Sequence, residues 1–391
     1  MSGIVIAGVG MHPFGRYPDK TPEKMSLHAI QAALEDSGLS YPDIELVLCG
    51  KVVYKKEGEG IDLMMKLGMT GVPIYQINAM CATGGAMLKL AADAITSGSC
   101  EVVLVYGFDK HQGMFQDLGE QWQNELGMKA SPIAFATVAQ RYMHEHGATE
   151  EDFARVAVKA HRNGARNPNA LFRNEITVED VLNSPMVAYP LHLYNFCTPD
   201  DGAAAAIVCS ERAAQKLGIR EPIRIASTVM QTASYPPPVL EPANQYSVDL
   251  TGGPGTPVVT LAAEKAYQAA GIGPQDIDIC EVQDTDSGHE LVHIEQLGLC
   301  EKGEAYRLLR QGVFDIDGRL PVNPSGGIQC KGEPPGASGL GQICEIVWQL
   351  RGEAGSRQVS RDVRNGLCQV FGWNHVAAVT ILQKMKGDDS Q

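Results

Sequence analysis

The sequence predicts an α/β protein made of two similar halves, and three features of the chain indicate this. Short apolar runs alternate with helical patterns along most of the 391 residues. One combination of helix, glycine, turn and strand occurs twice. Each half also has a glycine-rich turn that leads into a helix with an apolar stripe. Apolar strands between helices are typical of mainly parallel sheets that are covered on both faces.

The repeated combination recurs at a constant spacing of 233 residues, which aligns Gly38 with Gly271. Each glycine follows an expected helix, over residues 26–37 in the first half and 262–270 in the second. An apolar strand is expected shortly after each glycine. So long a period does not indicate a solenoid, and it predicts two related α/β units instead.

Composition and charge exclude several classes of protein. The net charge of −14 disfavours binding to nucleic acid or an anionic membrane, and no apolar run is long enough to span a bilayer. The ten cysteines form no C-x-x-C pair, which argues against a zinc ribbon or a disulfide framework and indicates a reducing compartment. We therefore expect a cytoplasmic protein with no metal, nucleic-acid or membrane partner. No P-loop and no GxGxxG in a strand–helix context is present, so ATP and NAD sites are not indicated.

The chain length predicts more than one domain. A segment rich in Met, Gln, His, Arg and Asn interrupts the first half and is typical of an insertion that carries substrate contacts. We expect a first half over residues 1–110, an inserted loop domain over 111–195, completion of the first half over 196–230, a connecting loop over 231–259 and a second half over 260–391.

The clearest candidate for chemistry is Cys81. An apolar run over residues 72–77 leads into a turn that holds this cysteine, and a helix with an apolar stripe follows. The N-terminus of a helix favours a thiolate through its unpaired N–H groups and its dipole. Small residues such as Gly84 and Gly85 would let a substrate carbonyl approach the backbone amides, as an oxyanion hole requires. We interpret Cys81 as a nucleophile; the alternative is a buried structural cysteine.

Four motifs support this interpretation through their order along the chain. They are Asn78-x-x-Cys81-Ala82-Thr83-Gly84, Asp201-Gly202-Ala203-Ala204, Asn323-Pro324-Ser325-Gly326-Gly327 and Gly336-Ala337-Ser338-Gly339. Together they resemble the thiolase superfamily, specifically its sterol-carrier-protein type, over nearly the whole chain. The resemblance implies the thiolase fold, with five layers α-β-α-β-α from two similar halves and an inserted loop domain. It also implies a homodimer and chemistry on acyl-coenzyme A thioesters, with Cys81 as the nucleophile.

The chain departs from the family pattern at the Gly-His-Pro loop, which reads Gly332-Glu333-Pro334. As a carboxylate near Cys81, Glu333 would oppose thiolate formation by like charge. As a neutral acid it could donate a hydrogen bond to an oxyanion, and as a base with a raised pKa it could accept the thiol proton. The alternative is a solvated loop residue in a chain that has lost activity.

The loop that reads His-Asp-Cys-Phe in sterol-carrier-type thiolases is Gln283-Asp284-Thr285-Asp286 in this chain. The acid/base cysteine of the family is therefore replaced by Thr285, which cannot titrate usefully. His289 falls where thiolases place an Asn that orients a catalytic water. An imidazole there could take over proton transfer, or it could be a polar surface residue.

The fourth loop of the family supplies a second acid/base cysteine near the C-terminus. Cys368 can be aligned with that cysteine, and His375 is an alternative. A core cysteine in a C-terminal strand is the plainer interpretation of Cys368. The resemblance also implies oxyanion or loop support from Gly336, Gly372 and Asn323.

Coenzyme A is expected as a co-substrate, with no tightly bound cofactor. The inserted segment offers Lys159, His161, Arg162 and Arg166 as groups that could contact its phosphates. The alternative for these side chains is a solvated helix face.

The leading functional hypothesis is a thiolase-type acyltransferase that cleaves or forms a carbon–carbon bond in an unusual 3-oxoacyl-CoA. The altered loops suggest an aryl or carboxylated substrate such as benzoylsuccinyl-CoA, in aromatic or lipid catabolism. We expect His289, then Cys368, to carry the proton transfers, with Glu333 assisting. By resemblance, a small zinc-ribbon/OB-fold protein could form a hetero-oligomer with this chain. The alternatives are a retro-aldolase acting on a steroid-type 3-hydroxyacyl-CoA and a non-catalytic acyl-CoA or lipid-binding protein.

Overall fold

The computed structural model describes residues 3–56, 58–111, 125, 130–234, 255–372 and 376–385. Nine strands of these residues form one mixed sheet in the order β3-β2-β4-β7-β1-β8-β11-β10-β9. The strands are β1 (Ile4–Gly15), β2 (Leu46–Gly50), β3 (Ile74–Ile77), β4 (Val102–Asp109), β7 (Asp201–Ser210), β8 (Ile223–Thr232), β9 (Ile279–Glu281), β10 (Asn365–Gly372) and β11 (Val376–Lys384).

This sheet consists of two sets of strands that meet at a single narrow contact. The first set is β3-β2-β4-β7-β1 and the second is β8-β11-β10-β9. Strands β1 and β8 join them through only two residue pairs, Val5 with Arg224 and Ile6 with Ile223. In contrast, β8 pairs with β11 along its whole length. Strand β8 therefore belongs to the second set, whereas the expected boundary at residue 230 would place most of it in the first half.

The expectation of mainly parallel pairing is wrong. Within the nine strands, β2 is parallel to β3 and β4, and β9 is parallel to β10. The pairs β1–β7, β4–β7, β10–β11 and β8–β11 are antiparallel. The sequence pattern is misleading because a strand covered on both faces is apolar throughout, whichever direction its neighbour runs.

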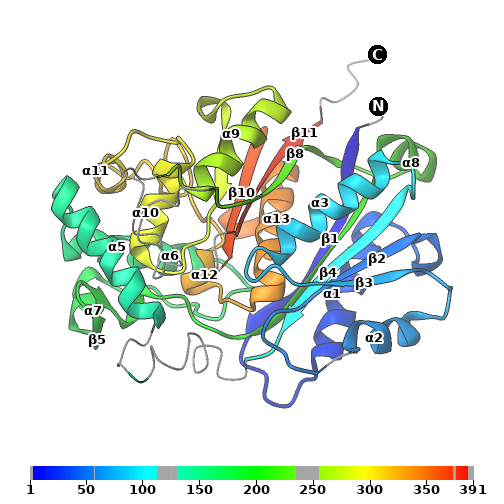
Figure 1. The fold of residues 1–391 in the computed structure, drawn as a ribbon, viewed down its shortest axis with the longest axis horizontal. Coiled ribbons are helices and arrows are strands. Elements are labelled where there is room, and N and C mark those ends of the chain that lie inside the picture. The colour runs from blue at the N-terminus through cyan, green and yellow to red at the C-terminus, as the bar shows by residue number, and fades with distance from the viewer. Residues whose placement is uncertain are drawn as a thin grey trace.

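Helices cover the two sets of strands in layers (Figure 1). Helix α1 packs on the outer face of the first set, against β1 and β7, and α9 packs on the outer face of the second, against β8 and β11. Helices α3 and α13 pack against each other and against strands of both sets, so they form the middle layer. The described helices of this α-β-α-β-α body are α1 (Pro22–Ser37), α2 (Glu59–Leu67), α3 (Thr83–Thr96), α8 (Glu211–Leu217), α9 (Val258–Ala270), α10 (Ser287–Gln296), α11 (Ala305–Arg310), α12 (Gly327–Cys330) and α13 (Pro335–Arg351).

The internal repeat is confirmed at the level of single hydrogen bonds. Gly38 ends α1 with a positive φ of 71°, and Gly271 ends α9 with a φ of 70°. The N–H of Gly38 donates to the carbonyls of Leu34 and Glu35, and that of Gly271 donates to the corresponding carbonyls, three and four residues earlier. A left-handed residue at this position costs glycine little, so the same stop signal closes both helices.

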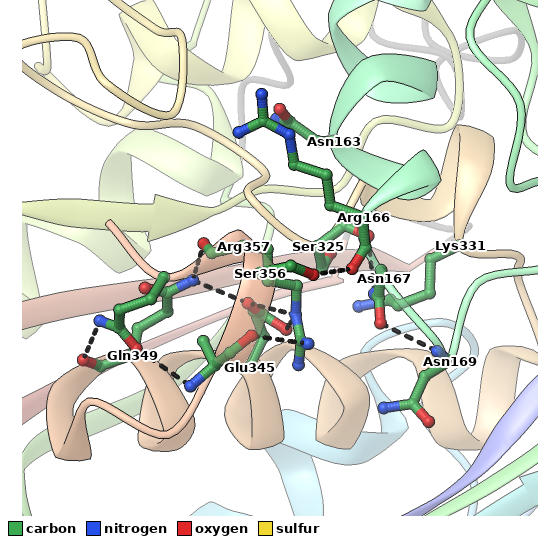
Figure 2. Close-up of polar contacts among 12 residues, drawn as sticks. Asn163, Arg166, Asn167, Asn169, Ser325, Lys331, Glu345, Gln349, Ser356 and Arg357 are labelled. Carbon is green, nitrogen blue, oxygen red and sulfur yellow. Dashed lines mark hydrogen bonds and ion pairs between the residues drawn. The ribbon is translucent and has the colours of Figure 1, made fainter. Parts of the chain in front are cut away.

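The inserted segment contributes three described helices and a short hairpin. They are α5 (Ala130–His146), α6 (Glu150–Ala165), α7 (Val178–Asn183), β5 (Met186–Ala188) and β6 (Leu191–His192). Helix α6 is anchored to the second half because Asn163 and Asn167 donate from their side chains to the carbonyls of Asn323 and Ser325, at 3.0 and 2.8 Å. Figure 2 shows Asn167 and Ser325 close to the buried ion pair between Glu345 of α13 and Arg357.

Across the described ranges, none of the helices combines the length and the apolar character that a membrane crossing requires. Most of the expected connecting loop over 231–259 lies outside the described residues.

Candidate active site

Cys81 lies in a tight turn between β3 and α3, and its neighbours fix the shape of that turn. Met80 adopts a left-handed conformation with a φ of 53°, which is uncommon for a residue other than glycine. The N–H of Met80 donates to Oδ1 of Asn78 at 3.0 Å, and the hydroxyl of Thr83 donates to the Met80 carbonyl at 2.6 Å. The Asn and Thr of the Asn-x-x-Cys-Ala-Thr motif therefore hold the backbone around the cysteine.

The pKa of Cys81 is raised well above its ordinary value, contrary to the thiolate expected from the helix N-terminus. Burial of the thiol is the largest cause, and the negative charge of Glu333 is the second. The expected like-charge effect of Glu333 is therefore present. Cys81 rests as a thiol, and a base must remove its proton before it can attack.

Gly84 and Gly85 allow close packing of α3 against its neighbours. A Cβ on Gly84 would lie 2.7 Å from the backbone nitrogen of Leu340 in α13. A Cβ on Gly85 would lie 2.3 Å from the Cβ of Ala378 in β11. The small residues are therefore required where α3 meets α13 and β11.

Glu333 is not a solvated loop residue; its side chain is 1% exposed. Its Oε1 accepts a hydrogen bond from Nε2 of Gln283 at 3.0 Å, and its Oε2 has no hydrogen-bond partner among the described residues. Burial raises its pKa, and the neighbouring Cys197, Cys81 and Gln283 side chains lower it by smaller amounts. A buried carboxylate with a spare oxygen beside a thiol is suited to accept the thiol proton.

Two buried glutamines connect Glu333 with the second half of the sheet. The N–H of Gln283 donates to Oε1 of Gln369 in β10 at 2.9 Å. Oε1 of Gln283 and Nε2 of Gln369 have no partner among the described residues. Buried polar groups are normally satisfied, so unpaired atoms close to Glu333 are suited to a polar substrate group or water.

Cys197 is a site residue that the sequence reasoning missed. It is 6% exposed, and its pKa is raised by burial first, then by the charge of Glu333, with a further contribution from Cys81. The sequence feature that could have identified it is its position just before the Asp201-Gly202 motif, where the inserted segment ends and the first half resumes.

His289 is buried, not a surface residue, with 3% exposure. Its Nδ1 contacts Oδ2 of Asp286, which also caps α10 by accepting from the N–H of Gly288 at 2.8 Å. The Nε2 of His289 has no partner among the described residues. An imidazole oriented by a carboxylate, with its other nitrogen unpaired, is typical of a proton-transfer group.

Cys368 is in the core of β10 and does not join Cys81. It belongs to the apolar cluster of the middle layer and is paired across the sheet with Thr380 and Glu281. Four residues further along the same strand, a Cβ on Gly372 would lie 3.2 Å from the Cβ of Met80. At about 3.3 Å per residue, Cys368 is about 13 Å from the part of β10 that reaches the nucleophile. The expected acid/base role of Cys368 is therefore wrong, and His375 lies outside the described residues.

Gly372 is beside the Cys81 turn as expected, but Gly336 and Asn323 have structural partners. The N–H of Gly336 donates to Oδ2 of Asp109 at 2.7 Å. Asn323 donates from Nδ2 to Oε2 of Glu290 at 2.8 Å and accepts from a backbone N–H. Burial raises the pKa of Asp109 to about 6, although four backbone N–H groups contact its carboxylate.

The basic residues expected to contact coenzyme A fall into different environments. Lys159 is 1% exposed, and its Nζ donates to Glu290 at 3.1 Å and to the Val322 carbonyl at 2.8 Å, which argues against a phosphate role. His161 is also buried, and burial lowers its pKa, so it is neutral near pH 7. Arg162 is half-buried and paired with Asp315. Arg166 is exposed at the end of α6, and its backbone carbonyl accepts a hydrogen bond from the Ser356 hydroxyl (Figure 2).

With this geometry established, sequence comparison identifies the family. The model "Thiolase, N-terminal domain" matches residues 4–212, and "Thiolase C-terminal domain-like" matches residues 248–384. The chain belongs to the thiolase family. It is an acyltransferase of thiolase type, a family that uses coenzyme A as a co-substrate.

Similar proteins cover the chain almost from end to end. The acetyl-CoA acetyltransferase of Methanothermobacter thermautotrophicus is 34% identical and covers 98% of this chain and 100% of its own. The benzoylsuccinyl-CoA thiolase subunit BbsB of Thauera aromatica is 35% identical, over 94% of both chains. Among solved structures, the Ltp2-ChsH2(DUF35) aldolase is 28% identical with a TM-score of 0.85, over 98% of both chains. Human mitochondrial 3-ketoacyl-CoA thiolase in complex with CoA is 18% identical with a TM-score of 0.73 over 98% of both chains, and it shares the fold.

Proposed function

We propose that this protein cleaves, or forms, a carbon–carbon bond in a 3-oxoacyl-CoA through a thioester intermediate on Cys81. The observation that carries the proposal is the buried Glu333 carboxylate, whose Oε2 has no hydrogen-bond partner among the described residues and whose charge raises the pKa of Cys81. A base next to a nucleophile is the arrangement that covalent acyl transfer requires. The family membership and the intact Asn-x-x-Cys-Ala-Thr turn support the same chemistry.

In the cleavage direction, Glu333 accepts the proton of Cys81 as the sulfur attacks the 3-oxo carbon of the substrate. The bond between C2 and C3 then breaks, and its electron pair remains on the departing acyl-CoA as an enolate. An acid protonates C2 of that enolate. The acyl group remains on Cys81 until the thiol of coenzyme A attacks it, and Cys81 recovers its proton from Glu333.

His289 is our candidate for the proton transfer at the sulfur of coenzyme A. Its Nδ1 is held by Asp286, so Nε2 is the nitrogen available for exchange. The side chain of Gln283, three residues before Asp286, donates to Glu333, so the loop that precedes α10 contacts the proposed base. Arg166 is our candidate for contact with a coenzyme A phosphate, because it is the exposed cation among those expected on α6.

The substrate that we propose is an aryl or carboxylated 3-oxoacyl-CoA of the benzoylsuccinyl-CoA kind. This relies on the similarity to BbsB of Thauera aromatica and on the unusual Glu333 and Gln283 loops. We also propose that the chain forms a homodimer and associates with a small zinc-ribbon/OB-fold protein. The word "subunit" in the name of BbsB, and the two proteins named together in the Ltp2-ChsH2(DUF35) aldolase, support the second association.

The proposal is tested by mass spectrometry after incubation with benzoylsuccinyl-CoA, acetoacetyl-CoA and longer 3-oxoacyl-CoAs. We expect the mass of one acyl group on the peptide that contains Cys81, and its loss when coenzyme A is added. A Cys81→Ala variant should carry no adduct. Absence of an adduct from every substrate would contradict the mechanism.

A retro-aldolase is the second candidate, because a solved relative with a TM-score of 0.85 is named an aldolase. Retro-aldol cleavage needs no acyl-cysteine. Cys81→Ala that retained full cleavage of a 3-hydroxyacyl-CoA would therefore favour this candidate over acyl transfer.

A further inference from the structure

The segment that contains Cys197 is hydrogen-bonded between two loops of the candidate active site. The N–H of Cys197 donates to the carbonyl of Thr285 at 2.8 Å, in the loop that leads to His289. The next residue, Thr198, accepts from the N–H of Glu333 at 2.9 Å. Backbone hydrogen bonds on both sides therefore fix the position of Cys197 relative to the loop that precedes α10 and to Glu333.

Cys81 and Cys197 share one carboxylate. The charge of Glu333 raises the pKa of both thiols, and Cys81 raises the pKa of Cys197 further. Oε2 of Glu333 is buried and has no hydrogen-bond partner in the described part of the chain. Glu333 is 1% exposed and Cys197 is 6% exposed, so both side chains are shielded from bulk water. The site thus contains a second thiol that acylation of Cys81 does not use.

The reaction needs a proton donor for a carbon atom, and the described surroundings of Cys81 offer few. Thr285 does not titrate in the useful range, and Cys368 is at the wrong end of β10. A thiol that stays protonated at neutral pH can donate to an enolate, and its thiolate is then basic enough to take a proton from C2 in the reverse direction. Cys197 meets this requirement because burial favours its neutral form.

We propose that Cys197 is the acid/base residue that transfers the proton to and from C2 of the acyl-CoA. This inference depends on the acyl-transfer function proposed above. In cleavage, the S–H bond of Cys197 breaks as a C–H bond forms at C2, and a thiolate remains on Cys197. His289 then takes the proton of the coenzyme A thiol and passes it to that thiolate. Each turnover leaves Cys197, His289 and Glu333 in their starting forms.

Exchange of the C2 hydrogens of acetyl-CoA with deuterated water tests this step, because it needs proton transfer at carbon. The wild-type protein should incorporate deuterium, as followed by mass spectrometry under reducing conditions. Cys197→Ala and Cys197→Ser should both slow the exchange by at least about 100-fold, since general acid–base catalysis contributes about 10²–10⁴-fold and a serine hydroxyl is too weak an acid. Cys100 is also buried, and the acidic groups that affect its thiol are Glu45 and Glu101, not Glu333. Cys100→Ser is therefore the control and should exchange like the wild type.

A second measurement distinguishes this role from a folding defect. Transfer of the acetyl group from acetyl-CoA to Cys81 needs no proton at carbon, so the Cys197 variants should acetylate Cys81 at close to the wild-type rate. Exchange at the wild-type rate in Cys197→Ala would overturn the role of Cys197 and leave the acyl-Cys81 mechanism standing. Loss of both exchange and acetylation in the Cys197 variants would assign Cys197 a structural role and also overturn the inference. A wild-type protein in which neither acetyl-CoA nor any of the 3-oxoacyl-CoAs named above acylates Cys81 would remove the proposed function itself.

Discussion

At the scale of single residues, opposing effects act on the pKa of Cys81. The start of α3 favours a thiolate at Cys81, but burial and the Glu333 carboxylate raise the pKa of this thiol. The same carboxylate is the base that we propose for this thiol, and burial raises its own pKa. Glu333 therefore keeps Cys81 protonated in the free protein, and it is also the group that we propose to accept the thiol proton during attack.

Glu333→Gln should separate these two effects. Removing the negative charge lowers the pKa of Cys81, so the pH at which iodoacetamide alkylates this thiol should shift downward and alkylation at pH 7 should become faster. Acyl transfer should fall by about 10²–10⁴-fold, because the amide cannot accept the proton. Peptide mapping by mass spectrometry resolves alkylation at Cys81 from that at the other nine cysteines.

Glu264→Gln, which changes an exposed carboxylate on α9, is the matched control and should alter neither property. Slower alkylation of Cys81 in Glu333→Gln would contradict the charge argument. Unchanged acyl transfer would remove Glu333 from the mechanism.

At the scale of elements, the position of the nucleophile depends on how closely α3 and α13 approach. The two helices cross at Gly84 and Gly339, and Glu333 lies two residues before α13 begins. Any separation of the helices would move Cys81 and Glu333 apart. A side chain at the crossing therefore affects both stability and chemistry.

Gly84→Ala should destabilise the protein by about 1–3 kcal/mol, the usual cost of overpacking, because the new Cβ meets backbone atoms of α13 at 2.7 and 2.9 Å. Gly339→Ala is the graded comparison, since its closest contact would be 3.3 Å, and it should cost less. Urea unfolding measures both, and the rate of Cys81 acylation should fall in the same order. An equal or larger loss in Gly339→Ala would contradict this description of the crossing.

At the scale of the whole molecule, buried polar groups connect units that the sequence keeps far apart. Lys159 of α6 reaches Glu290 of α10, and Asn323 donates to the same carboxylate. Lys331 likewise lies 3.5 Å from Glu281, and both are 1% exposed. These contacts fix the inserted helices and the second half in one arrangement, because an unpaired buried charge is costly.

Lys159→Met should lower the free energy of unfolding by about 3–5 kcal/mol, because it leaves Glu290 charged and buried without its cation. Adding Glu290→Gln should recover most of this loss, since the neutral amide still accepts from Asn323. Chemical denaturation of the single and double variants provides the measurement. A single variant as stable as the wild type, or a double variant less stable than the single, would contradict the role of the pair.

The sequence by itself determined the two-half α/β architecture, the helix stops at Gly38 and Gly271, and the placement of Cys81 at a helix start. These features depend on local periodicity, backbone conformation and a repeat, all of which act between residues close in sequence. For Glu333, the motif order left open whether the residue acts as an acid or base beside Cys81 or is a solvated loop residue.

Only the tertiary structure decided which residues surround Cys81. It brought in Cys197 and Gln283, placed Cys368 in the core, and turned Lys159 inward to Glu290. It also raised the pKa of Cys81, where the helix dipole alone predicted the opposite. The physical reason is that the burial and the charged neighbours of a residue depend on segments that are distant along the chain. A local sequence pattern cannot predict them.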